Sequence, residues 1–464
     1  MRPRTGCTLR EAGRSLREEV PSSAMGPSFR PEEHPAGSRL ARALARMDSL
    51  VDWERRERSE GEGMRMRQSL APIRDLLERL GSPEGRFRTV LVAGTKGKGS
   101  TASLIAAGLR RTGSAVGLYT SPHVERVHER IRLGPGDISD EELAQALERA
   151  FGALDEAEAR ATPGARATWF DVLTAAGLLV FAESGVEWAV LECGLGGRLD
   201  STNAASPELS LLTNVDLEHT AILGSTRAAI AREKAAIARA GRPLVSAVGP
   251  EGDEAADAVA EVARELGARL VSLEVRAEDS IEERNVALAR AALDELGKAV
   301  PDRAGTRLCA ALLDGRARLE ARLPGRLEIL ERDGTPIVLD GAHVPSSLAL
   351  VLRDLARDER LHGGAQALVG MGRDKDASGL LKTLRGHVDR VLCTSAGRGP
   401  YRDPEELAAL ARSLGFAAVA VSDARDALDE ARERALGRGW VLVTGSLHLV
   451  GRVRGSLVRT TSAC

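Results

Sequence analysis

The stretch Val90-Leu-Val-Ala-Gly-Thr-Lys-Gly-Lys-Gly-Ser-Thr101 decides the fold of this chain. Its apolar, β-branched start at residues 89–92 predicts a buried strand, and an apolar helical pattern follows from 101 to 109. Between them lies a turn with three glycines, Gly94, Gly97 and Gly99. Glycines let backbone N–H groups approach oxygens closely, the helix N-terminus adds a positive dipole, and Lys98 adds a full charge. The stretch predicts a phosphate-binding loop, although its spacing departs from G-x-x-x-x-G-K-[ST], and an ordinary Gly-rich turn is the alternative.

The composition fits a globular protein with small substrates. The chain has 464 residues, a length typical of roughly three domains or of two large ones, and its 43% hydrophobic content is ample for real cores. Aromatic residues make up 3%, so packing must rest on Leu, Val and Ala. The 65 basic and 67 acidic residues nearly cancel, which argues against a nucleic-acid binder that works through bulk charge.

The cysteine pattern and the absence of long apolar runs predict a cytoplasmic protein. No apolar run approaches the roughly 20 residues that span a bilayer, so we expect no membrane association. Residues 1–38 mix Arg, Pro, Gly and Ser with acidic residues and have no apolar core, which predicts a disordered extension and not a secretory signal. The cysteines are far apart, odd in number and without a C-x-x-C pair, which favours a reducing compartment over disulfides or a zinc site. They are Cys7, Cys193, Cys309, Cys393 and Cys464.

Strands alternate with helices through the first part of the chain, and this alternation predicts a mostly parallel sheet. Helical leucine spacing precedes it from about Ser38 to Leu80. The expected strands are 89–93, 116–119, 188–191, 209–213 and 243–247. The expected helices are 101–112, 141–158, 172–184 and one that carries Glu233 and Lys234.

A second α/β alternation begins after Pro324-Gly325, which we interpret as a hinge. Its expected strands are 327–330, 336–339, 366–370, 390–393, 417–421 and 440–443. The predicted organisation is a nucleotide-binding domain over 39–312 and a second α/β domain over 313–464.

Several polar residues follow predicted strands, where the ligand crevice of an open α/β sheet lies. Glu192 comes directly after a strand and has the acidic side chain that Mg²⁺ prefers, or it caps the following turn. His219 is a second candidate ligand, although a lone histidine is more often a surface residue. Lys234, taken alone, looks like a solvated lysine on an Ala-rich helix. Arg326 and the segment 340–343 lie where a nucleotide between two domains would be contacted.

Several motifs occur together in one order, and with them the chain resembles the folylpolyglutamate synthase/dihydrofolate synthase family of Mur-type ligases. The phosphate loop is one of them, and Leu191-Glu-Cys-Gly-Leu-Gly-Gly-Arg-Leu-Asp-Ser-Thr-Asn203 is the longest. The resemblance runs from about residue 40 to the C-terminus. The matching segments are 93–100, 119–123, 168–171, 191–203, 218–224, 230–235, 324–328, 339–343, 370–376 and 445–446, together with Asn285.

The resemblance implies a Mur-ligase-like α/β fold, with an N-terminal P-loop ATPase domain and a smaller C-terminal Rossmann-like domain. It assigns catalytic roles to Lys98, His219 and Lys234, the last of which family members carry as a carbamate. It places ATP on Thr95, Gly97, Lys98, Gly99, Ser100, Asn285, Arg326, Asp340 and His343. It places one or two Mg²⁺ ions on Ser121, Glu192 and His219, and the pterin or folate near Thr168, Trp169, Phe170 and Asp171.

The implied reaction is a two-step amide ligation by a monomer. A dihydropteroate or folate carboxylate would attack the γ-phosphate of ATP, and the amine of L-glutamate would then displace phosphate from the acyl phosphate. Charge builds on phosphoryl oxygens in such a step, so Lys98 and Mg²⁺ would act electrostatically. Domain closure would exclude the water that otherwise hydrolyses the acyl phosphate.

Four residues depart from the family pattern, and they leave the substrate range open. Lys96 replaces the usual Asn of the phosphate loop, Asp171 a usual Glu, Glu218 the usual Asp before the histidine, and Val344 the usual Asn after the 340–343 segment. The alternatives are a related ligase that acts on another carboxylate and an ATP-binding paralogue without activity. The presence of Glu192, His219 and Lys234 argues against the paralogue without activity, because a protein that only binds ATP would not need all three.

Overall fold

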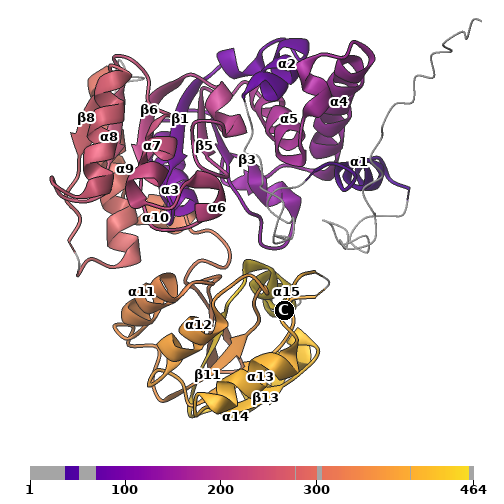
Figure 1. Cartoon of the computed structure of the whole chain (residues 1–464), viewed down its shortest axis with the longest axis vertical. Helices are drawn as coiled ribbons and strands as arrows, with labels where there is room; N and C mark the ends of the chain where they lie inside the picture. The colour runs from indigo at the N-terminus through magenta and orange to yellow at the C-terminus, as the bar shows by residue number, and fades with distance from the viewer. Residues whose placement is uncertain (1–36, 52–68, 277, 300–305, 398, 459–464) are drawn as a thin grey trace, which may run out of the picture.

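The computed structural model describes residues 37–51, 69–276, 278–299, 306–397 and 399–458, which form two α/β units stacked along the long axis (Figure 1). The first 36 residues, on which the predicted extension falls, lie outside the described ranges. So does most of the segment between the two N-terminal helices, α1 (Arg39–Met47) and α2 (Ala71–Arg79). Each unit has its own sheet, as the predicted fold class requires.

The N-terminal unit contains an eight-stranded, mostly parallel sheet in the order β4-β3-β2-β5-β1-β6-β7-β8. The predicted strands are present, and the phosphate-loop strand β1 is central, paired in parallel with β5 and β6. The short strands β3, β4 and β8 are additional, and β3 and β4 pair antiparallel. The bounds are β1 Arg88–Ala93, β2 Val116–Tyr119, β3 Ile131–Leu133, β4 Gly136–Asp137, β5 Trp188–Glu192, β6 Pro207–Leu212, β7 Pro243–Ser246 and β8 Arg269–Ser272.

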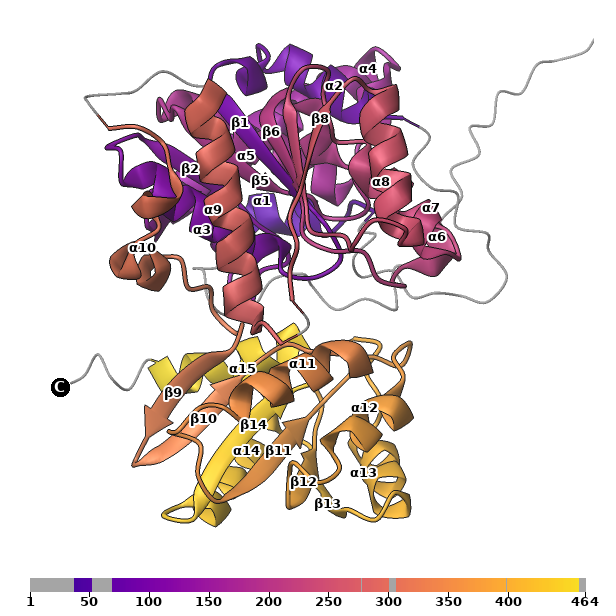
Figure 2. The same cartoon turned by 90° about the vertical axis from the view of Figure 1, so that its left-hand side faces the viewer.

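Helices cover both faces of this sheet, which is why β1 is apolar at consecutive positions. Val90 and Val92 face a core formed with α3 and α9, whereas Leu91 and Ala93 face the core under α4, α5, α7 and α8. Figure 2 shows α9 lying across the sheet. The bounds are α3 Lys98–Arg110, α4 Asp140–Ala159, α5 Trp169–Glu183, α6 Thr220–Leu223, α7 Arg227–Ala235, α8 Glu254–Glu265, α9 Ile281–Ala299 and α10 Gly315–Glu320.

The C-terminal unit is a six-stranded sheet in the order β13-β12-β11-β14-β10-β9, parallel except for the edge strand β9. The strands are β9 Glu328–Arg332, β10 Thr335–Leu339, β11 Gly364–Val369, β12 Arg390–Cys393, β13 Ala417–Ala420 and β14 Gly439–Thr444. The helices are α11 Pro345–Leu355, α12 Ala377–Leu384, α13 Pro404–Ser413, α14 Ala424–Ala435 and α15 Leu447–Val458. All six predicted strands of this half are present.

The packing of the segment around α10 bears on where the two units divide. Leu313, Ala317 and Ala321 are buried in the core beneath α3 and α9, so the segment around α10 packs with the N-terminal unit. The C-terminal sheet begins only at Glu328. We therefore propose a boundary at Pro324-Gly325, about a dozen residues after the predicted position at 312/313.

Helix α15 joins the units by packing on the loop that follows β2. Val124 of that loop is 6% exposed and belongs to the core of the C-terminal unit. Arg454 donates hydrogen bonds to Glu125 of the N-terminal unit and to both carboxylate oxygens of Glu328. At Gly451 a Cβ atom would lie 1.9 Å from the carbonyl oxygen of Val124, so only glycine permits this approach. The loop after β2 is thus held by both units.

This close approach predicts the effect of Gly451→Ala. The added methyl group must separate α15 from the loop, so we expect a loss of about 1–3 kcal/mol in the free energy of unfolding, measured by urea denaturation. The matched control is Gly152→Ala in α4, where no atom lies within 4 Å of the added Cβ. That change should raise stability by up to about 1 kcal/mol, because Ala favours helix interiors over Gly. Equal effects of the two changes would contradict the packing argument.

Candidate functional site

Glycines bring the phosphate loop against its neighbours. Gly94 has φ 144°, and a Cβ atom there would lie 1.9 Å from Thr213 Oγ1. Gly97 has φ 78°, and its Cβ would lie 2.5 Å from Asn285 Oδ1. Asn285 also accepts a hydrogen bond from the hydroxyl of Thr101, at 3.3 Å. The predicted ATP contact Asn285 therefore lies directly against the loop, from α9.

The end of β6 fixes the loop backbone in place. Asn214 accepts the N–H of Thr95 with its carbonyl oxygen at 3.0 Å and the N–H of Lys96 with its side chain at 2.9 Å. Thr213 donates its hydroxyl to the carbonyl of Lys96 at 2.6 Å. Helix α3 begins at Lys98, so its first N–H groups point towards the loop, and Ser100 lies half-buried in its first turn. Asn214 was not predicted, although its place after a strand is the signal that marked Glu192.

Glu192 ends β5 as a buried carboxylate, with 3% of its surface exposed. Its Oε2 accepts the backbone N–H of Ser121 at 2.8 Å and would lie 2.9 Å from a Cβ at Gly99. Burial raises the pKa of Glu192, and the charges of Lys98 and then Arg326 oppose that shift. The structure thus brings together two predicted metal ligands, Ser121 and Glu192, beside the phosphate loop.

Arg130 is a buried cation near Glu192 that the sequence did not indicate. It is 2% exposed, donates from Nε to His123 Nδ1 at 2.9 Å, and lies 4.8 Å from the centre of the Trp169 ring. Its charge, after those of Lys98 and Arg326, favours the ionised form of Glu192. Arg130 belongs to no sequence motif and reaches Trp169 through tertiary packing, so no sequence signal marked its position.

Lys234 is buried beneath the loop, not solvated as its helix alone suggested. It is 4% exposed and donates to the carbonyl oxygen of Gly94 at 2.7 Å. Burial lowers the pKa of Lys234 to about 7, with a further contribution from the charge of Lys98. A substantial neutral fraction at pH 7 makes this amine a nucleophile, which a solvated lysine is not.

His219 stands at the start of α6 with a left-handed backbone, φ 54°. Burial lowers its pKa to about 4, against the opposing charge of Glu218, and Lys375 and Lys98 lower it further. The imidazole is therefore neutral at pH 7, the form that binds a metal ion. Among the described residues, no group of three or more His, Cys, Asp or Glu side chains gathers as a metal cluster.

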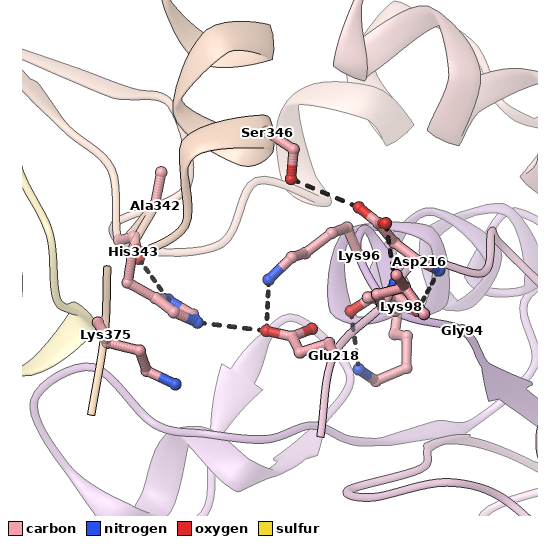
Figure 3. A network of polar contacts seen from close by, with 12 residues as sticks. Gly94, Lys96, Lys98, Asp216, Glu218, Ala342, His343, Ser346 and Lys375 are labelled. Atoms are coloured by element: carbon pink, nitrogen blue, oxygen red, sulfur yellow. Dashed lines mark hydrogen bonds and ion pairs between the residues drawn. The ribbon is translucent and has the colours of Figure 1, made fainter. Parts of the chain in front are cut away.

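A polar network joins the phosphate loop to the C-terminal unit (Figure 3). Lys96 Nζ donates to Glu218 Oε1 at 2.8 Å, and His343 Nε2 lies 3.4 Å from the same oxygen. Burial would raise the pKa of Glu218, but the contact with His343 and the charge of Lys96 outweigh it and lower that pKa well below its usual range. Nearby, Ser346 donates its hydroxyl to Asp216 at 3.4 Å.

Asp340 and Arg326 lie at the junction of the two units. Asp340 accepts the N–H groups of Leu327 and Ala342, each at 2.9 Å, so its carboxylate holds the start of the C-terminal unit together. Burial raises the pKa of Asp340. Arg326 lines a cavity of about 50 Å³ with Leu323 and other residues of the junction. Arg326 also lies near enough to Glu192 for its charge to lower the pKa of that carboxyl, whereas both oxygens of Asp340 accept backbone N–H groups.

The predicted pterin segment is the start of α5, and its polar side chains form a capping box. Asp171 accepts from the N–H and hydroxyl of Thr168 at 2.8 and 2.9 Å, and from the hydroxyl of Ser201 at 3.0 Å. Trp169 is 1% exposed, so it belongs to the core. Phe170 is half-buried. A pterin role for this segment stays a prediction, and Phe170 has the most accessible side chain for it.

The family model of the Mur ligase glutamate ligase domain matches residues 325–447. The dihydrofolate synthase/folylpolyglutamate synthase of Escherichia coli is 33% identical over 380 residues, which cover 78% of this chain and 85% of that protein. The chain belongs to the folylpolyglutamate synthase/dihydrofolate synthase family. The match to the ligase domain lies in the C-terminal unit, which begins at the junction after Pro324.

Two further comparisons set the extent of this likeness. A probable bifunctional folylpolyglutamate synthase/dihydropteroate synthase of Haloferax volcanii is 38% identical over 412 residues, 83% of this chain and 48% of that protein. The chain therefore spans about half the length of that member of the family. A bifunctional folylpolyglutamate synthase/dihydrofolate synthase structure with Mn, AMPPNP and L-glutamate bound has a TM-score of 0.73 at 27% identity, covering 91% of this chain and 99% of that one.

The buried amine of Lys234 predicts a pH-dependent stability. Its pKa is lower in the folded chain than in the unfolded chain, so the unfolded state binds more protons above pH 7. The stability contributed by Lys234 relative to Lys234→Met should therefore rise from pH 7 to pH 10, on the order of 1 kcal/mol per pH unit. Urea denaturation of both proteins in buffers free of carbon dioxide measures this difference. A difference that is constant with pH would contradict the burial argument.

Proposed function

We propose that the protein ligates L-glutamate to dihydropteroate, to a reduced folate, or to both, with hydrolysis of ATP to ADP. The observation that carries the proposal is the buried carboxylate of Glu192, which lies against Gly99 of the phosphate loop and within the electrostatic influence of Lys98. A carboxylate so close to a phosphate cradle would repel phosphate unless a cation lay between them. The relatives named for this activity support the same conclusion.

The phosphates of ATP would lie on the phosphate loop. The backbone around Gly97 and Gly99 and the first turn of α3, including Ser100, supply N–H groups, and Lys98 supplies the charge. Thr95 shapes the loop, because its hydroxyl accepts the N–H of Asp216 at 3.1 Å. The adenosine would extend towards Asn285, Arg326, Asp340 and His343.

One or two divalent cations fit the donor set of this site. A carboxylate, a hydroxyl and a neutral imidazole, together with phosphate oxygens, are ligands that Mg²⁺ accepts, and Glu192, Ser121 and His219 would hold it. When bound, the cation would neutralise the charge that develops on the transferred phosphoryl group. A related structure that contains Mn and AMPPNP supports a divalent cation together with the nucleotide.

The chain itself contributes position and charge to the chemistry. The substrate carboxylate would attack the γ-phosphorus to form an acyl phosphate and release ADP. The amine of glutamate would then attack the acyl carbon, lose its proton and expel phosphate. Lys98 would stabilise the phosphoryl oxygens in the first step, and apposition of the two units would keep water from the acyl phosphate.

The test of this function is glutamate-dependent ADP release. Purified protein with ATP and Mg²⁺ would be supplied with 7,8-dihydropteroate, tetrahydrofolate or neither, each with and without L-glutamate. We expect ADP release and amide formation that require glutamate and at least one pterin substrate. The pterin that supports turnover also decides between the two folate reactions.

The internal control for this assay is Lys98→Ala, which should lower ADP release by about a hundredfold or more because it removes the charge next to the transferred phosphate. Turnover with an unrelated carboxylate alone would favour the related ligase. A protein that binds ATP without any turnover would be the inactive paralogue.

We propose in addition that Lys234 can carry a carbamate. Its buried, partly neutral amine is the form that reacts with carbon dioxide, and the product would place a carboxylate beneath the loop, where Lys98 adds positive charge. With ¹³C-labelled bicarbonate, we expect a carbamate carbon resonance that is absent from Lys234→Ala. Short carboxylates should partly restore the activity of that variant. Full activity of Lys234→Ala without them would remove the need for a carbamate.

We place the working protein in the cytoplasm as a monomer with small-molecule partners and without nucleic acid or membrane. Cys193, Cys309 and Cys393 are free thiols, which suits a reducing compartment. Within the described ranges, no helix is long and apolar enough to cross a bilayer. Sedimentation of the full chain would test the predicted monomer.

A further inference from the structure

Two residues at which we expect a departure from the family pattern contact each other in the structure. Lys96 and Glu218 are separated by more than a hundred residues in sequence, yet Lys96 Nζ lies 2.8 Å from Glu218 Oε1. The two side chains are opposite in charge, and each is long enough to reach the other between the two segments.

The same carboxylate oxygen reaches the other unit of the molecule. His343, from the segment after β10, lies 3.4 Å from Glu218 Oε1 and directs its Nδ1 to the carbonyl of Gly341 at 3.1 Å. Figure 3 shows Glu218 between Lys96 and His343. The backbone of Lys96 is held by Asn214, so the lysine, through Glu218, connects the phosphate loop to the C-terminal unit.

The environment makes this ion pair stronger than one on an open surface. The side chains of Lys96 and Glu218 are 30% and 16% exposed, so water and salt screen the pair only partly. The pairing with Glu218 also balances the positive charge of Lys96 in the phosphate loop. Among the described ion pairs, the other loop cation, Lys98, has no carboxylate contact.

We propose that Lys96, acting through Glu218, is a positioning residue that couples the phosphate loop to His343 and so holds the two units together over the nucleotide. Its catalytic consequence rests on the proposed ligase function, because a retained closed arrangement protects an acyl phosphate from water. The coupling of the two units does not rest on that function, because the contacts are made by residues of the chain itself.

Hydrogen exchange on the full chain without ligands tests the structural part. The change Lys96→Asn removes the pair, and we expect amide exchange in residues 340–346 of the other unit to accelerate about threefold or more. Glu218→Ala should have a similar effect, and the double variant should add little to either. Lys96→Arg keeps the charge and should restore protection, whereas Arg434→Gln breaks an ion pair with Glu430 on α14 and should leave the segment unchanged.

The ratio of phosphate released to amide formed tests the catalytic part. It should be close to one for the natural chain and for Lys96→Arg, and should at least double for Lys96→Asn, because open units admit water. A purely structural weakness would lower the rate without changing this ratio.

Unchanged exchange in residues 340–346 for Lys96→Asn would overturn the coupling. Altered exchange with an unchanged ratio of phosphate to amide would overturn the catalytic role of Lys96. If no protein forms amide, the ligase function is refuted, and the exchange experiment still decides whether Lys96 couples the two units.

Discussion

The burial of one carboxylate at the end of β5 constrains the whole site. Glu192 is 3% exposed and packs against the backbone at Gly99, where a side chain would come within 2.9 Å of it. An isolated buried carboxylate is strongly unfavourable, and removal of a partner from a buried pair typically costs about 3–5 kcal/mol. The position is tolerable because Ser121 donates its N–H and three cations lie near. The glycine in the loop and the cations around it therefore follow from a single requirement.

The same requirement links the site to the arrangement of the two units. Ser121, which caps Glu192, begins the loop whose Val124 is buried in the core of the C-terminal unit. Arg454 of α15 holds the next residue, Glu125. A rotation of one unit would pull on this loop and so on the donor that stabilises Glu192. Glu218 and His343 form a second connection, so the two units are in contact at a second point.

Sequence patterns predicted the elements that depend on local chemistry. β1, its glycine turn and α3 were predictable because a strand buried on both faces is continuously apolar and its turn needs residues that tolerate positive φ. β3, β4 and β8 were not, since they are short, partly polar and stabilised by pairing with neighbours. Arg130 and Asn214 were missed because the contact of Arg130 with the Trp169 ring and the hydrogen bond from Lys96 to Asn214 join segments that are far apart in the sequence. The pairing of Lys96 with Glu218 was hidden for the same reason, although both residues stood out singly.

The basic groups of the site explain why a lysine can be buried beneath a phosphate loop. The charge of Lys98 lowers the pKa of both Lys234 and His219, and three full positive charges so close together would repel one another strongly. Burial reduces this repulsion, because it leaves His219 neutral and Lys234 partly neutral at pH 7. The full positive charge then lies on Lys98. An arriving phosphate would favour protonation of both groups, whereas a cation would oppose it. The protonation of Lys234 and His219 is thus coupled to what occupies the site, and no sequence motif reveals that coupling, because it depends on three chain segments meeting in the fold.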